Sequence, residues 1–252
     1  MITLTKLIGQ TGVNLRANVY DGFYVRLTLL REKTKMHDDN YDGEDAGEHS
    51  KSAPIDDITL EELERELPGL SILSRFARNL ENIPWFANLG EPLTPGARAI
   101  AQHYVDALGF PDADIAILVD WEDAADAAES QDWHSPAWES EELLRADLTG
   151  RALEVLSEEA LKIGMTLIGE KITPPAKEAM EQASFIWDME DEASQRLAIG
   201  AAVQAANNAA LALIAANDPE FESEAHPLAA KFQLFEFGRW PVGIMGRSFN
   251  LF

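Results

Sequence analysis

Two acidic motifs of the same form offer the most specific chemistry in this sequence of 252 residues. Residues 120–123 read Asp-Trp-Glu-Asp and residues 188–191 read Asp-Met-Glu-Asp. The carboxylates of interest belong to Asp120, Asp123, Asp188 and Asp191. On a helix, the first and fourth residues of such a motif share one face, so two helices could together hold Mg²⁺ or Mn²⁺ and a phosphorylated substrate. The alternative is that the acids form the polar faces of separate helices and complement the helix dipoles.

A second acidic stretch, DDNYDGEDAGEH at 38–49, meets some requirements of a calcium-binding loop. Such a loop needs oxygen ligands at its first, third and fifth positions, glycine at the sixth and glutamate at the twelfth. The first three ligands are present as Asp38, Asn40 and Asp42. The twelfth position is His49, which is a poor calcium ligand. The stretch from 35 to 54 also lacks apolar anchors, which favours a solvated loop.

Tryptophans with acidic neighbours suggest a third kind of site. An aromatic ring beside a carboxylate suits an arginine, a lysine or a polyamine, through cation–π contact and ion pairing. The candidate partner-binding residues are Trp121, Trp133, His134 and Trp138. The alternative is that the tryptophans anchor the core near helix ends.

Several common chemistries have no support in the sequence. There is no cysteine, so disulfides and thiolate metal sites are excluded. None of the five histidines has the spacing of a zinc or di-iron motif. The chain also lacks a nucleophile elbow, a phosphate-binding loop and a dinucleotide fingerprint, so nucleophilic catalysis and nucleotide binding through these motifs are not expected.

The charge of the chain points to basic partners. The formal net charge is −24, from 44 acids and 20 bases. Such a field repels nucleic acids and anionic membranes and attracts basic proteins or other polycations. The segment 112–147 is especially acidic, with twelve acids and one base, and 37–66 carries twelve acids and two bases. Residues 1–36 are instead mildly basic.

The sequence predicts a soluble, cytoplasmic protein. Its first residues lack the basic start and long apolar run of a signal peptide. The most apolar stretch, 200–217, is interrupted by Gln204, Asn207 and Asn208. We therefore expect a buried helix there rather than a membrane span. The absence of cysteine is compatible with a reducing compartment.

The N-terminal segment has the pattern of a β-hairpin. Residues 13–19 and 23–29 alternate between apolar and polar side chains. A three-residue loop, 20–22, places the apolar residues of both strands on one face, whereas a two-residue loop would separate them. Residues 2–8 are predicted to form a third strand.

Capping signals divide the remainder into helices. Thr94-Pro95, Ser135-Pro136, Thr173-Pro174 and His226-Pro227 each combine a capping residue with a first-turn proline. The predicted helices are 60–80 with an interruption at 68–69, 95–109, 115–129, 136–168, 174–187, 192–217 and 227–238. Within the third of these, Ile115–Val119 alone would also suit a strand. The tail is predicted to form two short strands around 245–247.

An internal repeat is suggested by two pairs of similar stretches. LGEPLTPGAR at 89–98 matches IGEKITPPAK at 168–177, and EELERELPG at 61–69 resembles EELLRADLTG at 141–150. A duplicated three-helix unit, about 60–130 and 140–217, would explain both matches. The alternative is coincidence between helix-capping signals, and the sequence leaves both open.

These elements predict an α+β fold that is predominantly α. The expected segments are an N-terminal sheet at 1–36, an acidic loop at 37–57, a helical body at 58–237 and a β tail at 238–252. We expect the two β segments to share one sheet, since isolated hairpins are marginally stable, and the chain to form one domain.

Two functions fit these observations. The first is a binding module of the inhibitor or immunity type, which would capture a basic partner on its acidic surface. The second is a hydrolase that uses Mg²⁺ or Mn²⁺, held by the paired helix carboxylates, on a phosphorylated small molecule. A purely structural role is a third interpretation.

Overall fold

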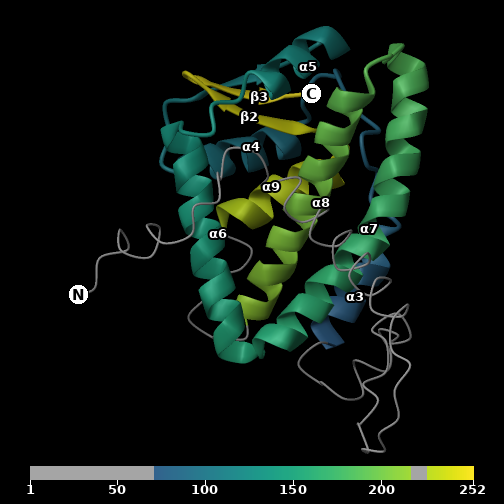
Figure 1. Ribbon diagram of the computed structural model, residues 1–252. Helices are drawn as coiled ribbons and strands as arrows, with labels where there is room; N and C mark the ends of the chain where they lie inside the picture. Colours follow the sequence, from purple (N-terminus) through teal and green to yellow (C-terminus); the bar gives the residue numbers. More distant parts are fainter. Residues whose placement is uncertain (1–70, 217–225) are drawn as a thin grey trace, which may run out of the picture. The chain divides into compact units, whose positions relative to one another are not determined.

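The structure is a computed structural model, which describes residues 71–216 and 226–252. All of them belong to one unit, Pro54–Phe252. The helices are α3 (Ser71–Leu80), α4 (Pro95–Ala107), α5 (Trp121–Glu129), α6 (Pro136–Val155), α7 (Glu158–Trp187), α8 (Glu192–Ala215) and α9 (Pro227–Glu236) (Figure 1). The strands are β1 (Asp114–Ile117), β2 (Pro241–Met245) and β3 (Ser248–Leu251). This part of the chain is mostly helical, as predicted.

Several sequence predictions lie outside the described residues. They are the N-terminal sheet at 1–36, the acidic loop at 37–57 with Asp38, Asn40 and Asp42, and the first part of the helix at 60–80. The second part of that helix is confirmed as α3.

The small sheet has the order β1-β3-β2. The predicted C-terminal strand pair is confirmed, since β2 and β3 run antiparallel on either side of a turn at Gly246. Strand β1 pairs in parallel with β3, from Asp114 opposite Ser248 to Ile117 opposite Leu251. The predicted helix at 115–129 is therefore wrong in its first part, where the strand alternative holds. Helix α5 begins only at Trp121, because Asp120 caps it with extended backbone.

Helix α8 is the centre of the helical body. It packs against α3, α5, α6, α7 and α9, and Figure 1 shows it between α6 and α7 with α9 crossing it. Nine of its alanines face the core or pack against its edge, and their small side chains allow close helix packing. Among the described helices, only α8 has the length and hydropathy of a membrane span, but 61% of that window is buried inside the fold. The core helix of a soluble protein has the same properties.

Capping residues fix most helix starts where the sequence placed them. Thr94 and Ser135 each accept a hydrogen bond from the backbone N–H three residues later. Ser157 does the same at the start of α7, where no helix start was predicted. His226 caps α9, since its Nδ1 accepts from the N–H of Leu228 at 3.2 Å. Burial lowers the pKa of His226, which favours the neutral ring that this role requires.

The boundary between α6 and α7 differs from the prediction. The predicted helix 136–168 is two helices, because the chain becomes extended at Leu156 and Ser157 caps α7. The predicted start at Thr173-Pro174 is wrong, since Pro174 and Pro175 lie inside α7. A buried stripe runs through this point and is formed by Ile168, Ile172, Ala176 and Met180. Packing of this stripe offsets the interior prolines, which cost about 3 kcal/mol or more each in a helix.

This correction bears on the internal repeat. Of the two most similar stretches, 89–98 contains a loop and the start of α4, whereas 168–177 lies wholly inside α7. The similarity of these two stretches is therefore not a similarity of structure, and the duplication gains no support from it.

Candidate functional site: an acidic surface around helix α5

The paired aspartates lie at helix ends. Asp120 is the N-cap of α5, and its Oδ1 accepts from the N–H of Asp123 at 2.8 Å. Asp191 is the N-cap of α8, and the Ser194 hydroxyl and the backbone N–H groups of residues 193 and 194 hold its pKa below the ordinary value. Asp188 ends α7 in a left-handed conformation, with a φ of 53°. Within the described residues, no three Asp, Glu or His side chains are grouped so that they could hold a metal ion.

A metal centre formed by all four carboxylates stays a prediction, and the two motifs do lie in one region. Trp121, inside the first motif, and Trp187, just before the second, both pack against Phe252, with ring centroids 6.1 and 5.0 Å from its own. The start of α5 and the end of α7 are therefore joined through one buried ring.

Substitution of Asp120 separates a capping role from a metal-binding role. Asn caps helices about as well as Asp, whereas loss of the cap to Ala costs about 1 kcal/mol. We therefore expect Asp120→Ala to lower the free energy of unfolding by about 1 kcal/mol and Asp120→Asn to leave it nearly unchanged, with or without Mg²⁺. Urea denaturation measures both values. If Asp120→Asn lowered the free energy of unfolding as much as Asp120→Ala does, but only in the presence of Mg²⁺, the result would instead indicate that Asp120 binds the metal.

The predicted aromatic site is divided by the structure. Trp121 is buried against Trp240, at a centroid distance of 5.8 Å, and offers no surface to a partner. Trp133 is 42% exposed and packs edge-on against Trp138, with centroids 4.6 Å apart. His134 is exposed beside them. Three of the four predicted residues therefore form a surface cluster at the start of α6.

This cluster lies in a strongly acidic stretch, residues 112–147, which we call the acidic segment. Of its twelve acids, all but two are exposed. The exposed acids are Asp112, Asp114, Asp120, Glu122, Asp123, Asp126, Glu129, Asp132, Glu139 and Asp147. In the part of the chain that the structure describes, only Asp147 of these ten forms an ion pair with a lysine or arginine, namely Arg151 at 2.9 Å.

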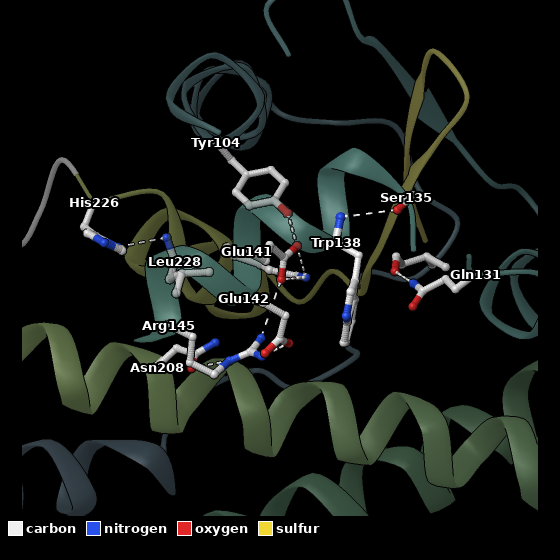
Figure 2. Close-up of polar contacts among 12 residues, drawn as sticks. Tyr104, Gln131, Ser135, Trp138, Glu141, Glu142, Arg145, Asn208, His226 and Leu228 are labelled. Atoms are coloured by element: carbon white, nitrogen blue, oxygen red, sulfur yellow. Dashed lines mark hydrogen bonds and ion pairs between the residues drawn. The ribbon is translucent and has the colours of Figure 1, made fainter. Parts of the chain in front are cut away.

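The two remaining acids are the buried Glu141 and the half-buried Glu142, which belong to a polar network that sequence reasoning missed. Lys231 donates to both oxygens of Glu141, at 2.7 and 2.9 Å. The Tyr104 hydroxyl also donates to Glu141, and Figure 2 shows it pointing at the carboxylate. Arg145 pairs with Glu142, and its Nε donates to Asn208 at 3.3 Å. The network therefore connects α4, α6, α8 and α9.

The charge state of this network follows from its contacts. Burial alone would raise the pKa of Glu141, but the charge and hydrogen bonds of Lys231, with help from Tyr104 and Arg145, hold the pKa below its ordinary value. Burial, and then the neighbouring Glu141 charge, raise the pKa of Tyr104 well above its ordinary value. Glu141 is thus a charged acceptor whose oxygens are already engaged, which suits a structural role. The sequence feature that could have revealed the burial of Glu141 is its helical spacing with the buried positions 137, 148 and 152 on α6.

A hollow of about 440 Å³ lies between the end of α3 and the middle of α7. Glu81, Glu170 and Glu178 supply its acids, and Lys171 lies 3.9 Å from Glu81. These side chains are exposed, so the hollow is an open depression with an excess of acids, formed by residues outside 112–147.

Comparisons with models of known families, with curated proteins and with solved structures each find no match for this chain. The function must therefore be argued from the chemistry of the surface itself.

Proposed function

We propose that this protein is a cytoplasmic binding protein that captures a basic protein, or another polycationic ligand, on its acidic segment. An inhibitor or immunity-type protein, which competes with phosphate for a basic surface, would need this kind of face. The observation that carries the proposal is the set of nine exposed carboxylates in 112–147 that have no lysine or arginine partner among the described residues. Exposed acids without bases repel one another, and a basic partner relieves that repulsion.

The aromatic cluster adds contact area to this charge. Trp133 and Trp138 present an exposed and a half-buried ring among the carboxylates. Arg145 lies over the Trp138 ring, 5.9 Å from its centroid, which is the cation–π contact that an aromatic ring makes with arginine. Aromatic anchors with a charged rim are typical of protein interfaces.

The proposal is tested with a lysine 20-mer, titrated calorimetrically in EDTA and about 0.1 M NaCl, where the Debye length is about 10 Å. The test variant removes four charges from the acidic segment as Asp123→Asn, Asp126→Asn, Glu129→Gln and Asp132→Asn. If each exposed pair contributes about 0.5 kcal/mol, the variant binds the peptide about 30-fold more weakly.

A matched control removes the same charge elsewhere, as Glu154→Gln, Glu158→Gln, Glu159→Gln and Glu170→Gln, which are all exposed. Three of these lie around the far end of α6, a helix of 20 residues that spans about 30 Å. We expect the control to bind within about threefold of the wild type, because separated exposed charges are screened by salt. Equal losses in the two variants would show that total charge, not the acidic segment, governs binding. Absence of binding by the wild type would reject the function.

A further inference from the structure

The last turn of α7 presents two large apolar side chains to solvent. Phe185 is 91% exposed and Ile186 is 75% exposed, the highest values among the large hydrophobic residues that the structure describes. Single exposed apolar residues are ordinary, but two adjacent ones at these values form an uncovered apolar tip. We call this pair the apolar tip.

The apolar tip is held by the residues on either side of it. Ala183 is buried, and Trp187 packs edge-on against Phe252 at 5.0 Å. Trp187 also lies so close to Gly90 that a side chain there would collide with its ring, and the Gly90 φ of +68° favours glycine as well. The end of α7 is therefore fixed, and the tip is presented without the entropic cost of ordering a loop.

Exposed carboxylates lie on both sides of the apolar tip along the chain. Residues 177–196 contain six acids, which are Glu178, Glu181, Asp188, Glu190, Asp191 and Glu192, and all are exposed. Their two bases already form ion pairs within the helices, Lys177 with Glu181 at 3.7 Å and Arg196 with Glu192 at 3.2 Å. On α7, Glu181 lies about one turn before Phe185 and Glu178 about two turns before it, both on the same face.

The apolar tip is also connected to the acidic segment. Trp121 begins α5 and Trp187 ends α7, and both rings pack against Phe252. Figure 1 shows α5 and the end of α7 at the same end of the described unit. The start of α5 and the end of α7, which carries the tip, therefore lie at the same end of the unit.

The negative charge near the apolar tip determines which kind of partner can bind there. A second copy of this chain would bring another net charge of −24 against the same acids, and an anionic membrane would be repelled in the same way. A basic surface with an apolar hollow complements both the apolar tip and the exposed carboxylates near it. Resting on the function proposed above, we propose that Phe185 and Ile186 are the hydrophobic anchor of the complex and insert into an apolar hollow that is ringed by lysine or arginine on the basic partner.

Two synthetic 20-mers test this proposal by calorimetry in EDTA: oligolysine, and an amphipathic helix of lysine and leucine. The wild type is expected to bind the lysine-leucine peptide about tenfold or more tightly than oligolysine, since interface anchors typically contribute 2 kcal/mol or more, about 30-fold. The variant Phe185→Ala/Ile186→Ala should lose this excess and keep its affinity for oligolysine. The control Leu153→Ala/Val155→Ala, which removes apolar side chains 44% and 38% exposed on α6, should retain the excess.

The outcomes separate this inference from the proposed function. If oligolysine binds but the lysine-leucine excess is absent, or survives in Phe185→Ala/Ile186→Ala, the anchor is rejected and the acidic capture stands. If neither peptide binds, the proposed function fails as well. Sedimentation velocity tests the remaining alternative, that a second copy of the chain covers the tip. A wild-type dimer that becomes monomeric in Phe185→Ala/Ile186→Ala would show this and would overturn the proposal.

Discussion

Replacement of Glu141 by alanine is expected to lower the free energy of unfolding by about 3–5 kcal/mol, the usual effect of removing one partner from a buried ion pair. Glu141 is buried, and Lys231 donates to both of its oxygens at 2.7 and 2.9 Å. Without the carboxylate, Lys231 and the Tyr104 hydroxyl remain desolvated with no acceptor. Urea denaturation at neutral pH measures the loss. The matched control is Glu139→Ala, two residues earlier on α6 and exposed, which should change stability by no more than about 0.5 kcal/mol.

The same carboxylate predicts a pH dependence. The folded pKa of Glu141 lies below its ordinary value of 4.5, so the unfolded chain takes up the proton first as the pH falls. Its contribution is therefore fully present above about pH 5, and is lost as the pH falls below 4.5 and through the folded pKa. The stability difference between the wild type and Glu141→Gln should be constant near neutrality and shrink in acid. A difference that is the same at neutral and at acidic pH would contradict a charged Glu141 in the fold.

Phe252→Ala is expected to cost about 3–5 kcal/mol, which is the usual range for truncation of a buried aromatic side chain. The Phe252 ring is fully buried between Trp121 and Trp187, and its backbone exchanges two hydrogen bonds with Trp240. Removal of the ring leaves a cavity where β3, α5 and α7 meet. Urea denaturation followed by tryptophan fluorescence reports the change, because three tryptophans surround this site.

The control for this substitution is Phe237→Ala at the end of α9, where the side chain is partly exposed. It should cost distinctly less than Phe252→Ala, since less apolar area and no enclosed cavity are involved. Similar losses for the two variants would mean that Phe252 does not join α5 to α7. The inference that packing on Phe252 brings the two acidic motifs together would then be wrong.

Local signals predicted the helix starts because their chemistry is local. Thr94, Ser135 and His226 cap the helices that the sequence assigned to them, and the turn at Gly246 joins the predicted strand pair. Each case needs only a side-chain acceptor near a backbone N–H, or a glycine at positive φ. Such features are encoded within a few residues, so they can be derived without knowledge of the fold.

Predictions failed where distant packing decides the structure. Ile115–Val119 suits a helix or a strand, and pairing of β1 with residues 248–251 selects the strand. Thr173-Pro174 has the form of a helix start, yet the buried stripe through Ile172 and Ala176 keeps α7 continuous. In both cases the deciding partner lies far away in the sequence.

In the candidate site, too, local features were predicted from the sequence, whereas features set by distant contacts were not. The exposure of most acids in 112–147 was expected from their charge, but the burial of Glu141 depended on a lysine 90 residues away. Asp120 and Asp191 fit both a metal-binding pattern and a capping pattern, and the structure shows the capping hydrogen bonds. Trp121 fits both a partner site and a core anchor, and its contacts with Trp240 and Phe252 show the second.

The most direct test of the central claim, that the exposed carboxylates act together on an approaching polycation, is the affinity for oligolysine as a function of salt. In EDTA, we predict an affinity that falls by about tenfold or more as NaCl rises from about 50 to about 200 mM, because exposed ion pairs are screened over this range. Replacement of EDTA by Mg²⁺ should change the affinity no more than NaCl of the same ionic strength. An affinity that is independent of salt, or binding that appears only with Mg²⁺, would contradict the claim and favour a metal-centred function.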